Sequence, residues 1–401
     1  GGTSAPQTIA VAVTAVNDPS VLVADTKTVL EDGTATGNVL FNDSDIDSVL
    51  SVASFTVNGT SYAAGSTPQS ISGVGVLILE ENGDYEFTPN GEWNGTVPQI
   101  TYTTNTGSSS TLNVSVTAVN DAPTLSGLLT AKTVLENAPA SLLDSDVIFG
   151  DIDSSKLDGG VLRVSGLDSA DIISIASSSS VKLSGSNVQA YISSSWTTIG
   201  VVSGGSGSDF TVTFNVSATP TLVDAVIQSL TFYNNDDSPT ASRTLTLTVS
   251  DGDGGTSAPQ TIAVAVTAVN DGPSGTSKTV TLDEDSSYTL TASDFGFIDV
   301  DGNLLKAVQI VSLPGEGVLK LDGKNVSDND YVSVSDIGKL VFTPAANANG
   351  TGYASLQFKV QDDGGTVNGG VDLDQSPNTL TFNVTAVNDA PTLSGLLTAK
   401  T

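Results

Sequence analysis

The sequence predicts an all-β chain built as a tandem array of sandwich domains. Short segments with apolar or β-branched residues at alternate positions are separated, about every ten residues, by turn-forming Gly, Asn, Asp, Ser and Pro. Two segments also occur twice without a change: Gly1–Asp18 recurs as Gly254–Asp271, and Val116–Thr133 recurs as Val384–Thr401. Such internal duplication is the sequence signature of a repeat architecture.

The string Val-Thr-Ala-Val-Asn-Asp occurs four times and marks the predicted joints between modules. It ends at Asp18, Asp121, Asp271 and Asp389. Each copy lies at the end of an alternating segment that predicts a module's last strand, namely residues 8–16, 111–119, 261–269 and 379–387. The Asn-Asp pair favours a turn, and the Pro that follows one or two residues later cannot extend a ladder.

These joints divide the chain into five predicted pieces. Residues 1–18 would be the C-terminal strand of a preceding module, and residues 390–401 would start a further long module. Between them we predict a short module at 19–121, a long module at 122–271 and a second short module at 272–389. The simplest array alternates short and long modules.

The modules differ in their internal motifs. The two short modules share a plan, because Tyr85–Asn90 and Asn94-Gly95-Thr96 in the first match Leu340–Pro344 and Asn349-Gly350-Thr351 in the other. In the long module, apolar residues within 220–230 fall at helical spacing, which predicts a helical turn or two between strands.

Composition restricts the partners of this chain. With 13 basic and 44 acidic residues, the formal net charge is −31. Such a charge repels nucleic-acid phosphates and anionic lipid surfaces, so cations are the expected partners. No apolar run approaches the ~18 residues of a membrane-spanning helix, so we expect no direct membrane insertion by this part of the chain.

Cysteine and histidine are both absent. Their absence removes thiol nucleophiles, imidazole bases and the usual ligands of zinc, copper and haem. An enzyme is therefore the least expected class. Paired carboxylates could hydrolyse glycosides, but their repetition near the joints favours a structural role.

Carboxylates cluster near the predicted joints in a recurring order. An acidic opening comes first, then an Asp-x-Asp segment, and two modules add an acidic hairpin. The openings contain Glu31-Asp32, Glu136-Asn137 and Asp283-Glu284-Asp285; the Asp-x-Asp segments are Asp45-Ile46-Asp47, Asp151-Ile152-Asp153 and Asp299-Val300-Asp301; the hairpins contain Asp251-Gly252-Asp253-Gly254 and Asp362-Asp363-Gly364. In an extended Asp-x-Asp segment both carboxylates lie on one side and can reach one cation.

Calcium is the cation that this inventory fits. It takes about six to eight oxygen ligands from carboxylates, amide side chains, main-chain carbonyls and water, whereas magnesium prefers a tight octahedron and keeps its waters. Asp-Gly and Asn-Asp are also ordinary turn formers, so any one of these carboxylates could simply be solvated. Turn chemistry does not require Glu at one spacing and Asp-x-Asp at another, so the recurring set favours calcium.

Together these motifs resemble the cadherin-like and VCBS-type modules that are repeated in giant bacterial RTX-type surface adhesins. The resemblance spans essentially the whole chain. It rests on the Val-Asn-Asp-Ala-Pro linkers, the acidic openings, the Asp-x-Asp segments, the Phe-Thr-Pro and Asn-Gly-Thr pair, and the segment Tyr233–Pro239 before Arg243–Gly255. It implies seven-stranded Greek-key sandwiches of the cadherin or immunoglobulin-like kind, joined end to end with calcium held between neighbouring modules.

The resemblance also implies a set of calcium ligands at each joint. At the second joint it implies Glu31 and Asp32 above, Asn120 and Asp121 in the linker, and Asp151, Asp153 and Asp251 below. At the third joint it implies Glu136 with Asp236 or Asp237 above, Asn270 and Asp271 in the linker, and Asp299, Asp301 and Asp362 below. The first joint retains Asn17, Asp18, Asp45 and Asp47, and the last begins with Glu284, Asn388 and Asp389. Because the first module's hairpin reads Thr104-Asn105-Thr106-Gly107 where the others have Asp, its joint is expected to bind calcium more weakly.

The predicted function is that of a non-enzymatic, calcium-rigidified extender or stalk in a secreted bacterial cell-surface adhesin, which supports adhesion or biofilm attachment. The alternative is self-association, in which copies of the chain pair or exchange strands to build an extracellular filament, sheath or matrix fibre. Direct glycan or protein binding is less favoured, because no exposed aromatic cluster is evident. Trp93 and Trp196 are expected to pack in or beside the cores.

Overall fold

The computed structural model describes residues 2–127, 130–391 and 395. These residues form two compact units, of which the first contains residues 2–124, 150–155 and 250–256, and the second contains the others. Each unit is described by itself. The segment 390–401, predicted to open a further module, lies mostly outside the described residues. None of the described helices is long and apolar enough to cross a membrane.

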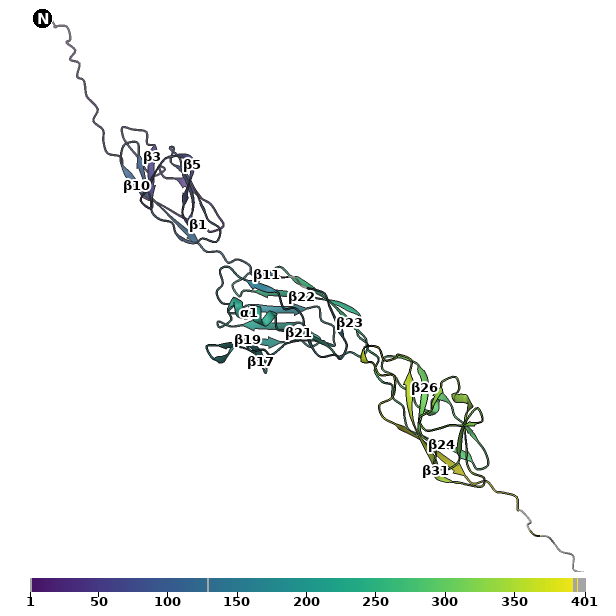
Figure 1. The fold of residues 1–401 in the computed structure, drawn as a ribbon. Helices are drawn as coiled ribbons and strands as arrows, with labels where there is room; N and C mark the ends of the chain where they lie inside the picture. The colour runs from purple at the N-terminus through teal and green to yellow at the C-terminus, as the bar shows by residue number, and fades with distance from the viewer. Residues whose placement is uncertain (1, 128–129, 392–394, 396–401) are drawn as a thin grey trace, which may run out of the picture. The chain divides into compact units, whose positions relative to one another are not determined.

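The first unit contains a sandwich of two sheets (Figure 1). One sheet has the order β1-β10-β9-β3-β4, with β8 also beside β10, and the other has the order β2-β7-β6-β5. Alternating side chains of β7 enter the core, where Tyr85 and Phe87 join Phe55 and Tyr102. The strands are β1 (Asp25–Leu30), β2 (Ala35–Asn38), β3 (Val52–Val57), β4 (Thr60–Ala63), β5 (Gly65–Ile71), β6 (Gly75–Leu79), β7 (Asp84–Pro89), β8 (Gly95–Thr96), β9 (Ile100–Thr104) and β10 (Ser109–Thr117).

The long sandwich has a wider sheet, in the order β12-β23-β22-β15-β20-β19-β18-β17, and a second sheet β13-β21-β16. Its strands are β11 (Thr124–Ser126), β12 (Lys132–Leu135), β13 (Ser141–Leu142), β14 (Ile148–Gly150), β15 (Val161–Ser165), β16 (Asp171–Ile175), β17 (Val181–Ser184), β18 (Asn187–Ile192), β19 (Ser195–Ser203), β20 (Phe210–Phe214), β21 (Leu230–Asn234), β22 (Ser242–Ser250) and β23 (Gln260–Thr267). The helix predicted within 220–230 is confirmed as α1 (Pro220–Ile227), which buries Val223, Val226 and Ile227. Pro suits this first turn because its missing N–H has no helical partner there.

The third sandwich pairs a sheet β24-β32-β31-β26-β29 with a sheet β25-β30-β27-β28. Its core contains Phe342 stacked on Phe382, with ring centroids 3.9 Å apart. The elements are β24 (Lys278–Asp283), β25 (Tyr288–Thr289), β26 (Leu305–Ser312), β27 (Val318–Leu321), β28 (Lys324–Asn325), β29 (Tyr331–Ser333), β30 (Leu340–Thr343), β31 (Gly350–Asp362), β32 (Asn378–Thr385) and the 3₁₀ turns η1 (Ala292–Asp294), η2 (Ile337–Lys339) and η3 (Val367–Gly369).

In every sandwich an early strand runs parallel to the last strand and beside it. The pairs are β1 with β10, β12 with β23, and β24 with β32. Because the paired strands point the same way, the chain enters each sandwich at one end and leaves it at the other. The acidic opening that follows each early strand therefore lies next to the linker that follows the last strand.

The three last strands end two residues earlier than the alternation predicts. Predicted strands at 111–119, 261–269 and 379–387 are found as β10, β23 and β32, which end at Thr117, Thr267 and Thr385. The next N–H that would continue each ladder, two residues on, is bound by a glutamate side chain instead. Each strand ends where the glutamate side chain, and no longer the backbone of a neighbouring strand, accepts its N–H group.

The strand predicted for residues 8–16 is not formed. Ile9, Val11 and Val13 are 87%, 78% and 89% exposed, and no described strand pairs with this segment. A single strand cannot satisfy its own backbone groups or bury a face. The alternating pattern is present there, but the neighbour that would make it a strand is not among the described residues.

Candidate metal centres at the joints

Each sandwich carries a buried glutamate that binds the backbone of the linker. Glu31, Glu136 and Glu284 are 4%, 3% and 6% exposed. Their Oε1 atoms accept the N–H groups of Val119, Val269 and Val387 at 2.6, 2.7 and 2.8 Å. The glutamate of each acidic opening is thereby fixed against the Val-Asn-Asp string that leaves the same sandwich.

The aspartates of the first three Val-Asn-Asp strings are each bound in turn by an Asp-x-Asp segment. The N–H of Asp271 donates to Oδ2 of Asp301 at 2.7 Å, and the N–H of Asp121 donates to Oδ2 of Asp153 at 3.0 Å. At the first joint the N–H of Asp18 donates to Oδ2 of Asp47 at 2.7 Å. The same backbone group meets the same kind of carboxylate at all three joints.

The linker asparagines bind the acidic hairpins. The Nδ2 of Asn120 donates to Oδ2 of Asp251 at 3.0 Å, and the Nδ2 of Asn270 donates to Oδ1 of Asp362 at 3.1 Å. Asn17 has no equivalent carboxylate, since its Nδ2 donates only to the backbone oxygen of Asp18 among the contacts of the described residues. The first joint thus lacks the hairpin contact, as its Thr104–Gly107 sequence predicts.

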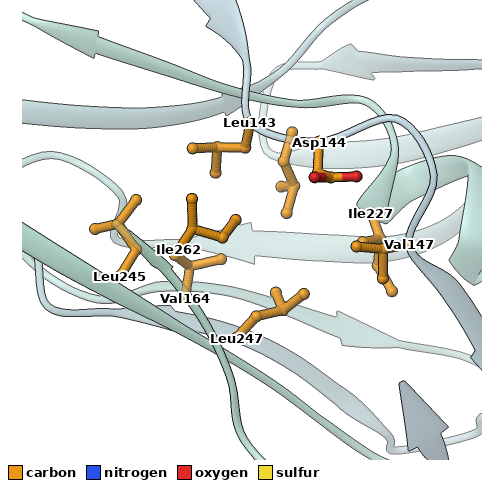
Figure 2. A pocket seen from close by; sticks show the side chains of 9 residues that line it. Leu143, Asp144, Val147, Val164, Ile227, Leu245, Leu247 and Ile262 are labelled. Atoms are coloured by element: carbon orange, nitrogen blue, oxygen red, sulfur yellow. The ribbon is translucent and has the colours of Figure 1, made fainter. Parts of the chain in front are cut away.

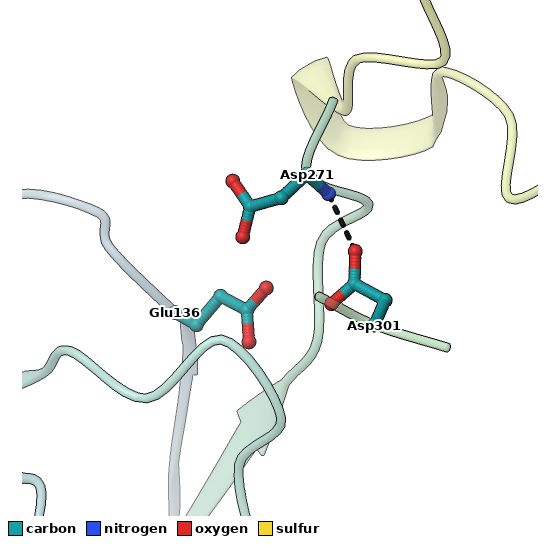
Figure 3. Close-up of side chains that lie close together, drawn as sticks. All are labelled: Glu136, Asp271 and Asp301. Atoms are coloured by element: carbon teal, nitrogen blue, oxygen red, sulfur yellow. Dashed lines mark hydrogen bonds between the residues drawn. The ribbon is translucent and has the colours of Figure 1, made fainter. Parts of the chain in front are cut away.

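The third joint brings three carboxylates together. Glu136, Asp271 and Asp301 each place one carboxylate oxygen within 4.8 Å of the others (Figure 3). Of the described residues, these form the one group of three acidic side chains that comes this close. None of the salt bridges formed by the described residues reaches them.

Several buried oxygens at this joint have no hydrogen-bond donor. Oε2 of Glu136, Oδ2 of Asp271 and Oδ2 of Asp299 are enclosed and bind no described group. A buried, unpaired carboxylate oxygen is costly, so it calls for a proton or a cation. Asp299 uses its other oxygen, Oδ1, to accept the N–H of Asn303 at 2.8 Å.

The electrostatics of this group disfavour its fully ionised form. Burial raises the pKa of Glu136, and the charges of Asp301, Asp271 and Asp237 raise it further, against the hydrogen bond from Val269. Burial also raises the pKa of Asp271, with added repulsion from Asp237, Asp301 and Asp299. Burial raises the pKa of Asp362 as well, although hydrogen bonds from Gly364 and Asn270 oppose the shift.

The second joint has the same hydrogen bonds but a looser carboxylate group. Oδ2 of Asp121 and Oδ2 of Asp151 are enclosed, and none of the described groups donates to them. Burial raises the pKa of Asp151, and the side chain of Asp153 adds to this shift. Asp251 differs, because its Oδ1 accepts the N–H groups of residues 253, 254 and 255; although burial acts against it, hydrogen bonds from Asn120 and from these N–H groups lower its pKa.

Other predicted ligands have defined local roles. Asp45 accepts the N–H groups of Asp47 and Ser48 at 2.8 and 2.7 Å, and its pKa is lowered chiefly by a hydrogen bond from Ser20. Asp236 accepts the N–H of Ser238, so it closes a turn. Two further residues stand near the chain surface: Asp32 is exposed, and Nδ2 of Asn388 donates to the backbone oxygen of Asp389.

Asp237, which the sequence could not separate from Asp236, is the one of the two that faces the third joint. Its Oδ1 accepts the Nδ2 of Asn137 at 3.1 Å, and its charge acts on both Glu136 and Asp271. A surface hollow lined by Asp237, Asn270 and Asp301 lies at this position.

Two residues of the joints were missed by the sequence reasoning. A hydrogen bond with Asp121 raises the pKa of Glu92, and repulsion from Asp121, Asp32 and Glu31 adds to it, so Glu92 is a further acid at the second joint. Glu92 has a φ of 62°, which is uncommon for Glu, and Asn347 holds a φ of 54° at the matching place in the third sandwich. The Nδ2 of Asn303 donates to Oδ1 of Asn270, and no motif pointed to it.

The remaining candidate sites lie away from the joints. The long sandwich contains an apolar cavity of about 10 Å³, lined by side chains such as Leu143, Val147 and Ile262, with Asp144 at its edge (Figure 2). Such a cavity is about the size of one water molecule and is a packing void.

The long sandwich carries one partly exposed aromatic pair, in which Tyr191 is exposed and Trp196 is half-buried. Tyr191 is 51% exposed and lies edge-on to Trp196, with centroids 5.3 Å apart, while Nζ of Lys182 lies 4.1 Å from the centroid of the Trp196 ring. Trp93, in contrast, packs against the first core as predicted.

Two family models match parts of this chain. Residues 17–119 match the model described as a bacterial cadherin-like domain, and residues 270–374 match the model described as a bacterial Ig domain. Neither match covers half of the chain. No curated protein matches it.

Solved structures of cadherin repeats are among those that match this chain. Cadherin domains 3–6 of protocadherin gamma B2 are 12% identical, with 92% of this chain and 73% of that chain covered and a TM-score of 0.40. Repeats EC22–24 of mouse cadherin-23 are 14% identical, with 90% and 96% covered and a TM-score of 0.39. An endo-fucoidan hydrolase also matches, at 16% identity, with 92% and 43% covered and a TM-score of 0.22.

At these identities and TM-scores the solved structures carry no argument about fold or function. The observed sheets confirm the all-β tandem sandwich fold that the sequence predicts. Two stretches of the chain are similar to structural domains of the bacterial cadherin-like and bacterial Ig kinds.

Proposed function

We propose that this chain is a calcium-stiffened stalk segment of an extracellular bacterial surface protein. The matches to bacterial cadherin-like and bacterial Ig domains support a non-enzymatic, extracellular role, since such domains usually lie outside the cell. The whole protein would be an RTX-type adhesin that holds adhesive domains away from the cell for surface attachment or biofilm formation. The proposed module boundaries are those predicted from the four Val-Asn-Asp strings.

The observation that carries this proposal is the group of bare, buried carboxylate oxygens at the third joint. Glu136, Asp271 and Asp301 converge within 4.8 Å, and enclosed oxygens of Glu136 and Asp271 have no donor. Oxygen-only donors of this kind suit calcium, and no nitrogen or sulfur ligand competes in a chain without His or Cys. The residues present therefore fit a calcium ion.

Calcium would be held at the third joint by Glu136, Asp237, Asp271, Asp299 and Asp301, and at the second joint by Glu92, Asp121, Asp151 and Asp153. When bound, the ion would supply positive charge to these carboxylates. The chain itself supplies the orientation, because Val269 and Asp271 donate backbone N–H groups that fix one oxygen of Glu136 and of Asp301. Without a cation the remaining oxygens repel one another across the linker.

Stiffening follows from the linkage between binding and order. A cation that binds the assembled joint, and not the unfolded chain, stabilises it by RT ln(1 + [Ca]/Kd), or ~2.7 kcal/mol when calcium is a hundredfold above Kd. The joint would be loose where free calcium is scarce and firm where it is abundant. A stalk exported from a cell meets those two conditions in that order.

The test is calcium titration of the full chain after chelation, followed by calorimetry, thermal melting and small-angle X-ray scattering. We expect calcium to raise the melting temperature and to lengthen the maximum dimension. The double variant D271N/D301N should lose most of both responses, whereas D158N, which alters an exposed aspartate, should keep them. Identical melting temperatures and scattering curves with and without calcium would contradict the proposal and would mean that the acidic clusters are solvated turns.

Self-association is the second candidate, and one observation supports it. Among the described strands, β17 pairs only with β18, so it is an edge strand of the wide sheet of the long sandwich, where a second copy could add a strand. Sedimentation across a concentration series separates the two proposals. A stalk stays monomeric at micromolar concentration, whereas a fibre subunit gains mass with concentration.

A further inference from the structure

The three buried glutamates share one hydrogen bond and differ in the other. Oε1 of Glu31, Glu136 and Glu284 accepts a linker N–H in each sandwich. The difference lies at the second carboxylate oxygen, Oε2. This atom decides whether the buried charge is satisfied by the protein itself.

In the first and third sandwiches an asparagine binds this second oxygen. The Nδ2 of Asn94 donates to Oε2 of Glu31 at 3.0 Å, and the Nδ2 of Asn349 donates to Oε2 of Glu284 at 2.8 Å. Both asparagines begin an Asn-Gly-Thr motif, and the glycines that follow have φ angles of 132° and 156°. The same local backbone therefore delivers the same amide in two sandwiches of different sequence.

Among the residues that the structure describes, the long sandwich offers no such amide. Oε2 of Glu136 is enclosed and no described group donates to it, although the residue is as buried as the other two. In place of an amide, the long sandwich sets the carboxylate of Asp237 near Glu136, where its charge adds to that of Asp271 and Asp301. Where the short sandwiches place an amide donor near the glutamate, the long sandwich places a second negative charge, that of Asp237.

The chemical consequence differs between the two arrangements. A hydrogen bond to an ionised group is worth more than one to a neutral group, and a buried charge without a partner is strongly destabilising. Glu31 and Glu284 each have a donor on both oxygens without any ion. Glu136 depends on an outside partner for its second oxygen.

We propose that Asn94 and Asn349 are positioning residues that replace a cation at the buried glutamates of the short sandwiches, so that dependence on a cation is concentrated at Glu136 of the long one. The part that concerns a cation rests on the proposed function. The part that concerns the amides does not, because the two hydrogen bonds are present without any ion. The joint that follows a long sandwich in the sequence would therefore be stabilised by calcium more strongly than the joint that follows a short one.

The first experiment measures how much the amides of Asn94 and Asn349 stabilise their sandwiches in the absence of any cation. The full chain and its N94A and N349A variants are melted in excess chelator, and hydrogen exchange followed by mass spectrometry reports each sandwich separately. We expect each substitution to lower the melting temperature of its own sandwich by about 5 °C, because a charged hydrogen bond is lost. Two variants that melt and exchange like the parent chain would overturn the proposal.

The second experiment adds calcium and uses the two variants as a matched pair. Glu31 lines one surface hollow with Glu92 and Asp153, so calcium can take over the oxygen that loses its donor in N94A and should restore the lost stability. The same comparison for N349A shows whether a cation can also take over the second oxygen of Glu284. A purely structural role would leave both variants equally impaired in calcium, and that result would overturn the exchange of amide for cation.

The aspartate variants N94D and N349D sharpen the same test. Each replaces the donor by a like charge, as the long sandwich does with Asp237, and each should be more destabilised in chelator than the alanine variant. Calcium should then restore N94D. If the parent chain shows no calcium response at all, the proposed calcium role fails, while the loss in chelator still decides the role of the amides.

Discussion

Residues 2–18 and 255–271 have the same sequence and different structures. In the second copy, β23 pairs with β22 on one side and β12 on the other, and Ile262, Val264 and Val266 are 4%, 1% and 3% exposed. In the first copy, the matching Ile9, Val11 and Val13 are almost fully exposed, and no strand forms. Identical propensities thus lead to a core strand in one place and an unpaired segment in the other.

The difference shows that the alternating pattern makes a segment able to form a strand, but that the strand forms only where neighbouring strands are present. Val and Ile gain from a sheet only when neighbours cover one face and satisfy the backbone. The contacts of the Asn-Asp pair at the end of the repeat also depend on which neighbours are present. Asp18 and Asp271 both donate their N–H to an Asp-x-Asp segment, but only Asp271 has a buried glutamate beside it among the described residues.

The largest effect should come from a charge placed at the same position of the two copies. Val264→Asp buries a carboxylate in the core of the long sandwich and should cost more than about 4 kcal/mol, enough to unfold it. Val11→Asp, in an exposed segment, should change stability by less than about 0.5 kcal/mol. Chemical denaturation of both variants measures the pair, and equal losses would contradict the view that only the second copy is packed.

The next effect should separate the two aspartates in calcium. Asp271→Asn removes one member of the three-carboxylate group and should abolish most of the calcium-dependent rise in melting temperature, worth ~2.7 kcal/mol at a hundredfold excess over Kd. Asp18→Asn should leave that rise nearly intact, because none of the described buried glutamates belongs to a carboxylate group with Asp18. A comparable loss in both variants would mean that the first joint binds calcium without its upper carboxylate.

A smaller effect should separate the two linker asparagines in the absence of metal. Asn270 donates to Asp362 and accepts from Asn303, whereas Asn17 donates only to the neighbouring backbone oxygen of Asp18. We expect Asn270→Ala to cost about 1–3 kcal/mol, because Asp362 loses a donor, and Asn17→Ala to cost almost nothing. Thermal melts in chelator measure both, and an unchanged Asn270→Ala variant would show that the hairpin contact adds no stability.

The smallest effect concerns pH in the sandwich that follows the first copy. Burial and the neighbouring charge of Asp43 raise the pKa of Asp25 to about 6, against hydrogen bonds from Asn42 and Tyr102. The folded state therefore binds this proton more tightly than the unfolded state, so stability rises as pH falls from 7 through 6 and is lost again as pH rises. Asp25→Asn should remove this part of the gain, by ~2 °C in melting temperature between pH 7 and pH 5. An equal gain in both proteins would assign the response to other carboxylates.

Much of the fold could be predicted from the sequence because its signals are local. Strands β10, β23 and β32 and helix α1 lie within a few residues of the predicted segments, since alternation and helical spacing are properties of short windows. Their ends could not be placed as well. Each last strand is stopped by a glutamate that is remote in sequence, 88 residues away in the case of Glu31 and Val119.

The candidate site was predictable in outline and not in detail. The repeated order of Glu, Asn-Asp and Asp-x-Asp indicated which segments would meet, and Glu136, Asp271 and Asp301 do converge. Glu92 and Asn303 gave no signal, because their roles depend on how loops fold against distant partners. Asn94 and Asn349 belong to the Asn-Gly-Thr motif that the sequence shows, but the motif alone could not predict which atoms their amides bind.

The parallel pairing of entering and leaving strands also sets how each sandwich would respond to tension. When the two ends are drawn apart, parallel neighbours slide past each other, so all bonds of the ladder share the load before any breaks. β1 and β24 each pair with their partner over six positions, whereas β12 pairs with β23 over four. Under a steady pull we expect the long sandwich to shear first and to protect the shorter ones on either side.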